Sequence, residues 1–468
     1  MSRIDLNNVD LAWLRMENPT NPMMITVVLQ FKGQINYDRL ITILEVTLGR
    51  YRRFRQCIVR PRRIFSRPYW EDDPHYAVED HVERLDLQLP ADEAALEELI
   101  NRKMNTRLDF AYPLWKLTLV DNYPQGSIII TRVHHCIADG ISLMQVLLQM
   151  TQISPDGPAN QIPADNSNRD EHQPNREPAT MHTAPQAVDR GQGSPIISST
   201  KAGEVTGKSF RGNLYRIPSS TEIIAAMARI VFRSPDPPTI LKGQLGKIKR
   251  AIWSEPFDLL EIKKIAQYQD ATINDVLMAV ASGAIRRYID LHRGNRKRNI
   301  RAFILVNLRG SIIDEELGNK FGLVFLTLPL DREQPLERLS EVKQGMDSLK
   351  ASAEYAATYL ILNILGQVPG WIEHLATLIL DTKGTVVATN VPGPRQQIYL
   401  AGAPIISITG WVPQSGRIGV GLSFISYNNQ VVVGLNVDAG LIPDPEKFLE
   451  LFNDEFKSFQ AVLTASSN

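Results

Sequence analysis

The sequence lacks the features that mark secreted, membrane-spanning or nucleic-acid-binding proteins. Only two cysteines, Cys57 and Cys136, occur in 468 residues. Two cysteines cannot build a disulfide framework or a cysteine-based zinc site, which suits a reducing compartment. Lysine plus arginine and aspartate plus glutamate both number 51, and this balance gives no field that would favour nucleic acid. The first residues are charged and lack the apolar core of a signal peptide. These absences predict a cytoplasmic protein.

Long hydrophobic runs are also missing. The longest uncharged stretch, residues 355–372, is interrupted by polar residues, a proline and two glycines. A spanning helix needs about 20 consecutive apolar residues, so this stretch predicts two short apolar helices broken at 366–370. Core packing is one interpretation of their apolar side chains. The alternative is a surface that lies on lipid, with these residues in contact: Leu360, Ile361, Ile364, Leu365 and Trp371.

The length of the chain favours two domains, because one simple core rarely grows to this size. Residues 154–208 are dominated by proline, glycine, serine and amide residues, with almost no aromatic side chains. This composition predicts a flexible linker. It divides the chain into an N-terminal domain, residues 1–153, and a C-terminal domain, residues 209–468. Strand and helix patterns alternate on both sides of the linker, which indicates an α/β protein.

The main candidates for chemistry are two histidines at the end of a predicted strand. Residues 126–130 form a β-branched run, His134 and His135 follow it, and Asp139-Gly140 begins a predicted helix. Asp139 can cap that helix, and Gly140 can take backbone angles closed to other residues. Adjacent strand residues face opposite sides, so only one histidine can face a given cleft. A neutral histidine can take a proton from a hydroxyl or thiol. A purely structural role for a buried histidine is the plain alternative.

His134-His135-x-x-x-Asp139-Gly140 resembles the active-site motif of the acyltransferase superfamily that includes chloramphenicol acetyltransferase, carnitine acyltransferases and condensation domains. Further motifs resemble one branch, the wax ester synthase/diacylglycerol acyltransferases. They are Pro113-Leu114-Trp115, Asn274-Asp275, Gly318-Asn319, Leu328-Pro329, Asn390-Val391-Pro392-Gly393-Pro394 and Leu400-Ala401-Gly402-Ala403. The resemblance covers essentially the whole chain apart from the linker. It implies two chloramphenicol acetyltransferase-like α/β domains, each a mixed sheet with helices, and an active-site channel between them.

The resemblance also implies residue roles. His135, with Asp139 four residues later, is expected to be the general base, and His134 to face inward as support. The oxyanion needs a donor, and Asn274 near the start of a predicted helix is the candidate. Cys136 is interpreted as packing, and no serine or cysteine nucleophile is required.

Two further segments are expected to support the motif. Phe54-Arg55-Gln56 resembles an arginine-containing segment of these acyltransferases, which implies that Arg55 pairs with Asp139; a solvated charge is the alternative. Arg50, Arg52 and Arg53 are interpreted as solvated charges. Pro113 and Trp115 precede the histidine strand, and Trp115 is expected to pack under the catalytic turn.

The implied reaction moves a long-chain acyl group from acyl-coenzyme A to a fatty alcohol, giving a wax ester, or to diacylglycerol, giving triacylglycerol. Acyl-coenzyme A is then a co-substrate, and neither a further cofactor nor a metal is expected, because His75 and His81 match no metal template. The basic residues between 286 and 301 are solvated, or contact coenzyme A phosphate or anionic lipid. Such substrates imply a peripheral contact with a membrane or lipid droplet. A condensation-type enzyme using carrier-protein thioesters and a non-catalytic lipid-binding protein of the same fold are the alternatives.

Overall fold

The computed structural model describes residues 3–61, 66–157, 218–292, 299–308 and 317–466. Residues 1–167 and 215–468 belong to one compact unit. From residue 158 onward, the predicted linker lies outside the described residues, and so do the basic residues 293–298.

The described part of the N-terminal half is built on a six-stranded mixed sheet with the order β13-β14-β2-β7-β6-β5. Neighbouring strands are antiparallel except for β5 and β6, which run parallel. The strands are β2 (Met24–Phe31), β5 (Val82–Leu85), β6 (Trp115–Tyr123), β7 (Gly126–His134), β13 (Tyr399–Leu400) and β14 (Ala403–Trp411). A smaller sheet joins β1 (Ile4–Asp5), β4 (Tyr69–Asp72) and β3 (Gln56–Val59).

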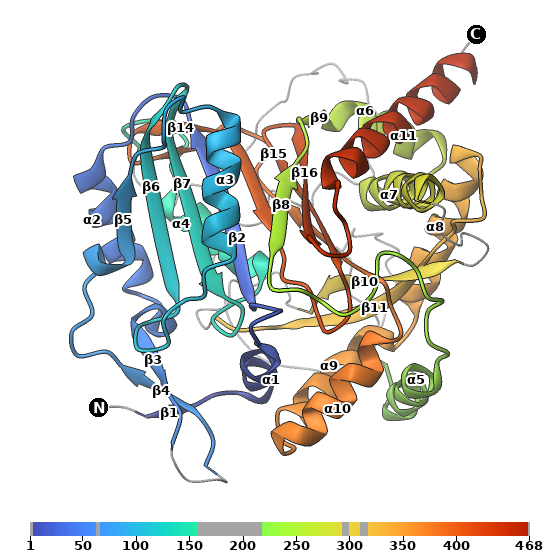
Figure 1. The fold of residues 1–468 in the computed structure, drawn as a ribbon, viewed down its shortest axis with the longest axis horizontal. Coiled ribbons are helices and arrows are strands. Elements are labelled where there is room, and N and C mark those ends of the chain that lie inside the picture. Colours follow the sequence, from blue (N-terminus) through green and yellow to red (C-terminus); the bar gives the residue numbers. More distant parts are fainter. Residues whose placement is uncertain (1–2, 62–65, 158–217, 293–298, 309–316, 467–468) are drawn as a thin grey trace, which may run out of the picture. The chain divides into compact units, whose positions relative to one another are not determined.

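Alternating side chains of β7 bury both faces of this first sheet. Ile129 and Val133 pack with α2 (Tyr37–Leu48) and α4 (Gly140–Met150), whereas Ile128 and Ile130 pack with α3 (Glu93–Met104). β-branched residues fit such a doubly covered, pleated surface. Figure 1 shows α3 lying over this sheet, near β7 and β2. Both faces of β7 are thus covered, His134 is the last residue of this strand, and His135 follows it.

The second described sheet has seven strands and is also mixed. Its order is β11-β10-β12-β15-β16-β8, with β9 beside β16, and the pairs β10/β12 and β12/β15 are parallel. The strands are β8 (Lys249–Trp253), β9 (Phe257–Asp258), β10 (Ile300–Asn307), β11 (Phe321–Leu328), β12 (Val386–Pro392), β15 (Val420–Tyr427) and β16 (Gln430–Asp438). The predicted hairpin at Asn428-Asn429 is confirmed, and both residues have positive φ angles of 48° and 61°.

Helices cover the second sheet as well. One face packs on a cluster that contains α6 (Leu259–Tyr268), α7 (Ile273–Leu291), α8 (Pro335–Ala351) and α11 (Pro445–Ser466). Phe303 and Phe325 on the other face pack with α5 (Ser220–Phe232) and α9 (Glu354–Leu365). The predicted break of residues 355–372 is confirmed, because α9 ends at Leu365 and α10 (Gly370–Asp381) begins five residues later. In the part of the chain that the structure describes, no helix is both long and apolar enough to cross a membrane.

The two mixed sheets with helices confirm the predicted α/β class. One segment crosses the predicted domain division. β13 and β14 belong to the C-terminal half of the sequence, but β14 pairs antiparallel with β2 from Ile405 to Trp411. The sequence pattern of a strand identifies its buried faces but not its partner, so this exchange could not be read from the chain.

Candidate active site

The geometry of the site starts from the tautomer of His135. Its Nδ1 lies 2.9 Å from Oδ1 of Asn319, which precedes β11. The Asn319 amide donates from Nδ2 to the His135 carbonyl oxygen (2.7 Å) and to Asp10 Oδ1 (2.8 Å). Since Nδ2 already donates twice, Asn319 Oδ1 must accept, and His135 Nδ1 must carry the proton. Nε2 is thereby left as the basic nitrogen of a neutral ring.

A buried ion pair holds Asn319 in this orientation. Asp10 is on α1 (Asn8–Met16), and its Oδ2 lies 2.5 Å from Arg53 Nη1. Arg53 also donates to the carbonyl oxygens of Cys136 (3.2 Å) and Ile137 (3.1 Å). Burial raises the pKa of Asp10, and Arg53 and Asn319 oppose that rise. The chain Arg53–Asp10–Asn319–His135 therefore joins four segments that are distant in sequence.

Aromatic side chains enclose the His135 ring. Trp13 of α1 stacks on it with centroids 4.2 Å apart and planes 7° from parallel, and Phe321 lies 5.7 Å away. Burial lowers the pKa of His135 to about 4, although the charge of Asp139 opposes this. The imidazole is thus neutral, as a proton acceptor must be, at ordinary pH.

His134 turns to the opposite side and makes structural contacts. Its Nδ1 accepts a hydrogen bond from the Cys136 backbone N–H at 3.1 Å, and its Nε2 bonds the Glu17 carboxylate. Arg107 also bonds Glu17. Burial alone would raise the pKa of Glu17, but His134 and Arg107 together lower it. Both ring nitrogens of His134 are occupied, so this residue supports the turn and has no nitrogen free for substrate.

The turn after the histidines is fixed by Asp139. Its Oδ1 accepts from the Ser142 N–H at 2.9 Å, which caps α4, and its Oδ2 accepts from the Lys320 N–H at 3.1 Å. Gly140 opens α4. A β-carbon there would lie 3.5 Å from Val391, in ordinary van der Waals contact. The Lys320 contact ties the turn to the segment that carries Asn319.

His135 lies on the wall of a largely apolar cavity of about 100 Å³. A single water needs roughly 10–15 Å³ by this measure, so the cavity is far larger than a packing defect. Most of the lining is aliphatic and aromatic. It comes from α1, β10, β11, β12, α9, α10 and the loop after β14: Trp13, Met16, Phe303, Leu305, Phe321, Leu323, Phe325, Ile361, Leu362, Leu365, Leu380, Val387, Val412 and Ile418. The arrangement can hold an alkyl chain beside a neutral histidine base.

The Pro-Leu-Trp segment lies beside the histidines as predicted. The Leu114 carbonyl accepts from the His134 N–H at 2.9 Å, and Trp115 pairs with Val133 across β6 and β7. Buried Trp115 stacks on His81 and donates from Nε1 to the Phe54 carbonyl at 2.8 Å. The Pro113 carbonyl accepts from the Trp115 N–H. These residues support the end of β7 and are absent from the cavity lining.

The predicted pairing of Arg55 with Asp139 is wrong: among the residues that the structure describes, these two form no ion pair. Arg55 makes no ion pair there, and its buried Nε has no hydrogen-bond partner. Arg53, interpreted from sequence as a solvated charge, is the residue that reaches the histidine turn. Residues 52–55 form a single turn of 3-10 helix, in which near neighbours point to different sides. Sequence alone could not choose between the arginines.

The structure gives Asn274 no visible connection to His135. It lies in the first turn of α7, whose cap is the predicted box of Thr272 and Asp275. Asn274 does not occur in the lining of the cavity. Its role as oxyanion donor stays a prediction from the resemblance. Cys136 is fully buried, and burial raises the pKa of its thiol well above the usual range. The thiol stays protonated, which fits packing rather than nucleophilic attack.

Several residues of this site could not be predicted from the sequence: Asp10, Trp13, Glu17, Arg53 and the role of Asn319. Only Asn319 carried a signal, because Gly318-Asn319 is one of the segments that resemble the acyltransferase branch. Nothing in the local pattern assigns it to the histidine, which lies 184 positions away.

Comparison with protein families agrees with these motifs. The wax ester synthase/diacylglycerol acyltransferase catalytic domain matches residues 6–277, and the WS/DGAT C-terminal domain matches residues 317–460. The chain belongs to this family. Family membership explains why the histidine motif, the Pro-Leu-Trp segment and the Gly-Asn pair occur in one chain.

Curated relatives match most of the chain at low identity. The probable diacylglycerol O-acyltransferase tgs1 of Mycobacterium tuberculosis is 26% identical over 407 residues, covering 84% of this chain and 82% of the relative. The O-acyltransferase WSD of Acinetobacter baylyi is 22% identical over 475 residues, covering 98% and 97%.

Solved structures share the fold. The wax ester synthase/diacylglycerol acyltransferase from Marinobacter aquaeolei VT8 matches with a TM-score of 0.67 and 20% identity, covering 98% of this chain and 99% of that one. The first condensation domain of the calcium-dependent antibiotic synthetase matches with a TM-score of 0.62 and 13% identity, covering 97% of each. This member of the wax ester synthase/diacylglycerol acyltransferase family therefore shares the α/β fold of these structures, as its motifs predicted.

Proposed function

We propose that this protein transfers a long-chain acyl group from acyl-coenzyme A to the hydroxyl of a fatty alcohol or of diacylglycerol. The observation that carries the proposal is a neutral histidine, with one tautomer fixed, on the wall of an apolar cavity. Relatives named for diacylglycerol O-acyltransfer and for wax ester synthesis support the same chemistry.

The reaction needs one proton to move twice. His135 Nε2 takes the proton of the acceptor hydroxyl. At the same time, the hydroxyl oxygen forms a bond to the thioester carbonyl carbon. The carbon–sulfur bond of the tetrahedral intermediate then breaks, and Nε2 returns the proton to the departing sulfur. The products are an oxygen ester and free coenzyme A. No covalent acyl-enzyme is needed when both substrates are bound together.

Burial disfavours the charged ring that forms during this reaction, and three contacts of His135 partly offset that effect. Asn319 Oδ1 continues to accept from Nδ1, so the ring keeps its orientation as Nε2 gains a proton. The charge of Asp139 raises the pKa of His135 against the effect of burial. The stacked face of Trp13 also attracts an imidazolium ion. Each contact is stronger with the charged ring, which is the requirement for lowering a barrier.

The direct test measures thiol release from palmitoyl-coenzyme A with hexadecanol or a diacylglycerol as acceptor. We expect His135→Ala to lower kcat by about a hundred- to ten-thousand-fold, because a general base is removed. His134→Ala is the matched control: it removes the partner of Glu17 and should lower the Tm more than His135→Ala does, while it retains more activity per folded molecule. A folded His135→Ala protein with near-full activity would refute the mechanism. If the protein used only carrier-protein thioesters as donors, a condensation-type enzyme would be favoured. If it turned over no thioester, a lipid-binding protein would be favoured.

We further propose that α9 and α10 contact a lipid surface. Exposed apolar side chains form stripes on these neighbouring helices: Leu360 and Ile364 on α9, and Trp371, Leu375, Leu378 and Ile379 on α10. Trp371 is 72% exposed. α5 contacts α9 (Figure 1). It adds the exposed side chains of Ile224 and Phe232. Exposed apolar side chains gathered on neighbouring helices favour a membrane or droplet interface, and other residues of α9 and α10 line the cavity.

Vesicle flotation tests this contact. We expect the wild-type protein to float with phospholipid vesicles and the double variant Trp371→Ser plus Leu375→Ser to float much less, because two exposed apolar anchors are lost. Thiol release from a detergent-dispersed substrate should be unchanged, since neither residue lines the cavity. Equal flotation of the two proteins would show that this surface does not contact lipid.

A further inference from the structure

The large cavity beside the histidine base has two ends, which belong to different hydrophobic clusters. Trp13 and Phe321 pack in one cluster, and Phe303 and Phe325 pack in another. All four side chains line the cavity, as does Leu323, which packs against both clusters. Trp13 and Phe321 contact the histidine ring. The cavity therefore has a histidine end and a far end, with Leu323 between them.

The strands β10 and β11 fix the distance between the two ends. Phe321, Leu323 and Phe325 occupy alternate positions of β11, so their side chains share one face. Phe303 pairs with Phe325 across the two strands. Four residues of strand cover about 13 Å, and the ring centres of His135 and Phe321 are 5.7 Å apart. The path from the histidine to the far end is therefore roughly 13–19 Å long, which an extended chain of roughly 11–16 bonds spans.

The two rings at the far end are held from behind. Phe303 and Phe325 have ring centres 4.9 Å apart. Arg233 lies over the Phe325 ring, with its guanidinium carbon 4.5 Å from the ring centre. The backbone of Gly384 lies so close to Phe303 that a β-carbon there would come within 2.3 Å of the ring. Thr327, the next residue on the same face of β11, is not in the lining. The cavity thus ends at the two rings.

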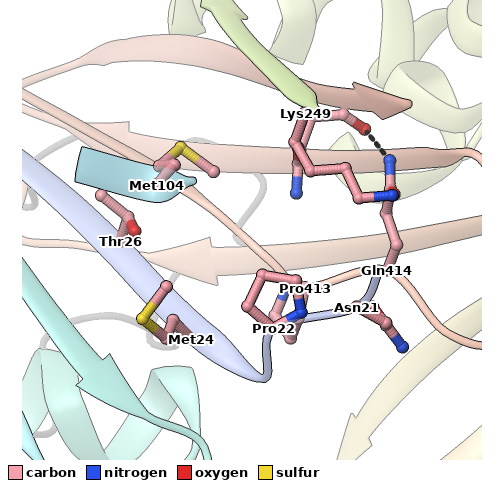
Figure 2. A pocket seen from close by; sticks show the side chains of 9 residues that line it. Asn21, Pro22, Met24, Thr26, Met104, Lys249, Pro413 and Gln414 are labelled. Carbon is pink, nitrogen blue, oxygen red and sulfur yellow. Dashed lines mark hydrogen bonds between the residues drawn. The ribbon is translucent and has the colours of Figure 1, made fainter. Parts of the chain in front are cut away.

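The loop after β14 does not lengthen this path. Pro413 and Gln414 of the loop line the large cavity and also the small cavity drawn in Figure 2. The small cavity has a volume of about 10 Å³, which is barely room for one water molecule. An alkyl chain cannot continue into so small a space, so the two rings are the end that it meets.

We propose that Phe303 and Phe325 set the longest alkyl chain that fits beside His135, whether the chain belongs to the acyl donor or to the alcohol acceptor. This inference rests on the proposed acyl transfer and deepens it. Each methylene buried along the path improves binding by about fourfold, and the gain ends where the chain meets the rings. The two rings thus determine specificity by touching the end of the chain rather than the reacting atoms.

The dependence of kcat/KM on chain length tests the proposal. Thiol release is measured with saturated acyl-coenzyme A donors from octanoyl to eicosanoyl and one acceptor, and then with alcohols from octanol to eicosanol and one donor. In one series we expect kcat/KM to rise about fourfold per methylene and to stop rising at roughly 11–16 bonds. The series that shows this break identifies the chain that occupies the cavity.

Two substitutions should move the break in opposite directions. Phe303→Leu makes the end wall smaller, so the longest chain of the series should gain at least about fourfold relative to the dodecyl chain. Leu323→Phe fills the middle of the path and should move the break to shorter chains. It adds atoms to an existing cavity, so it leaves no void in the core. Phe448→Leu on α11 is the matched control, because Phe448 is fully buried but is not in the lining. It should lower the Tm without moving the break.

Equilibrium binding gives a readout that does not need turnover. The Kd values of the same donors and alcohols, each titrated alone by isothermal calorimetry, should show the same break and the same shifts. A break in Kd without any thiol release would support the chain-length assignment and refute acyl transfer. A break that stays in place in both Phe303→Leu and Leu323→Phe, or the absence of a break from both series, would overturn the assignment.

Discussion

At the scale of single residues, the site depends on an amide rather than on a carboxylate. Asn319 accepts from His135 Nδ1 while its own Nδ2 is committed to Asp10 and the His135 carbonyl. Asn319 fixes the tautomer and raises the pKa of the ring through its hydrogen bond, but it adds no negative charge as a carboxylate would, and burial outweighs its effect. Burial lowers the pKa of His135 to about 4, which keeps Nε2 unprotonated at the pH where hydroxyl attack takes place.

The pH dependence of kcat/KM follows from this. For the wild-type enzyme we expect no loss of activity until the pH falls toward about 4, where His135 takes up a proton. Asn319→Asp places a negative charge beside the imidazole, so the pKa of His135 should rise and the acidic limb should move to higher pH. Asn122→Asp on β6 is a control asparagine that bonds only the Leu87 backbone, and it should leave the limb in place. An unchanged limb in Asn319→Asp would contradict the assigned contact.

The lowered pKa of His135 also makes the folded chain less stable at acidic pH. The pKa of His135 is lower in the folded chain than the value of about 6.5 expected in the unfolded chain. The unfolded chain therefore binds the proton first as the pH falls. The contribution of neutral His135 to stability is complete above about pH 6.5 and is lost as the pH falls through the lowered pKa.

At the scale of elements, α9 serves two surfaces at once. Ile361, Leu362 and Leu365 face the cavity, whereas Leu360 and Ile364 are exposed. The sequence hypothesis grouped Ile361 and Leu365 with the lipid-contacting residues, and the structure corrects this because helical spacing turns them to the inner side. One helix therefore separates the alkyl-binding cavity from the outer apolar stripe.

Two substitutions three positions apart on α9 separate these surfaces. Ile361→Asp puts a charge into the cavity wall and should reduce kcat/KM for palmitoyl-coenzyme A by at least about tenfold, since burying a charge without a partner is costly. Ile364→Asp should leave that activity unchanged on a dispersed substrate and weaken vesicle flotation. Both are measured by thiol release and flotation, with circular dichroism to check folding. Equal effects of the two changes on activity would contradict the two-sided assignment.

At the scale of the whole molecule, both halves of the sequence contribute residues to the site and to the first sheet. His135 comes from the N-terminal half and its partner Asn319 from the C-terminal half. β14 completes the first sheet by pairing with β2. Arg15 on α1 bonds both Glu373 of α10 and the Val368 carbonyl. The halves are thus held together by contacts that do not require the peptide connection between them.

This arrangement predicts the behaviour of a nicked chain. Composition predicts that limited proteolysis cuts first within residues 154–208. The two fragments should then elute together and retain thiol-release activity, because β2/β14 pairing and the His135–Asn319 contact persist. Size-exclusion chromatography with activity assays on the fractions checks this. Separation of the fragments under native conditions would show that the connection itself is needed for association.

The sequence by itself determined the α/β class, the strand-to-helix position of the histidine pair, the cap formed by Asp139, the break between α9 and α10 and the family. These features are local: they depend on periodicity, turn residues and capping within a few positions, or on motifs readable in order. The tertiary structure alone decided that Asn319 orients His135, that Arg53 rather than Arg55 reaches the turn, and that β14 joins the first sheet. Those contacts join residues far apart along the chain, and their partners are set by how the two sheets pack, which no local pattern encodes.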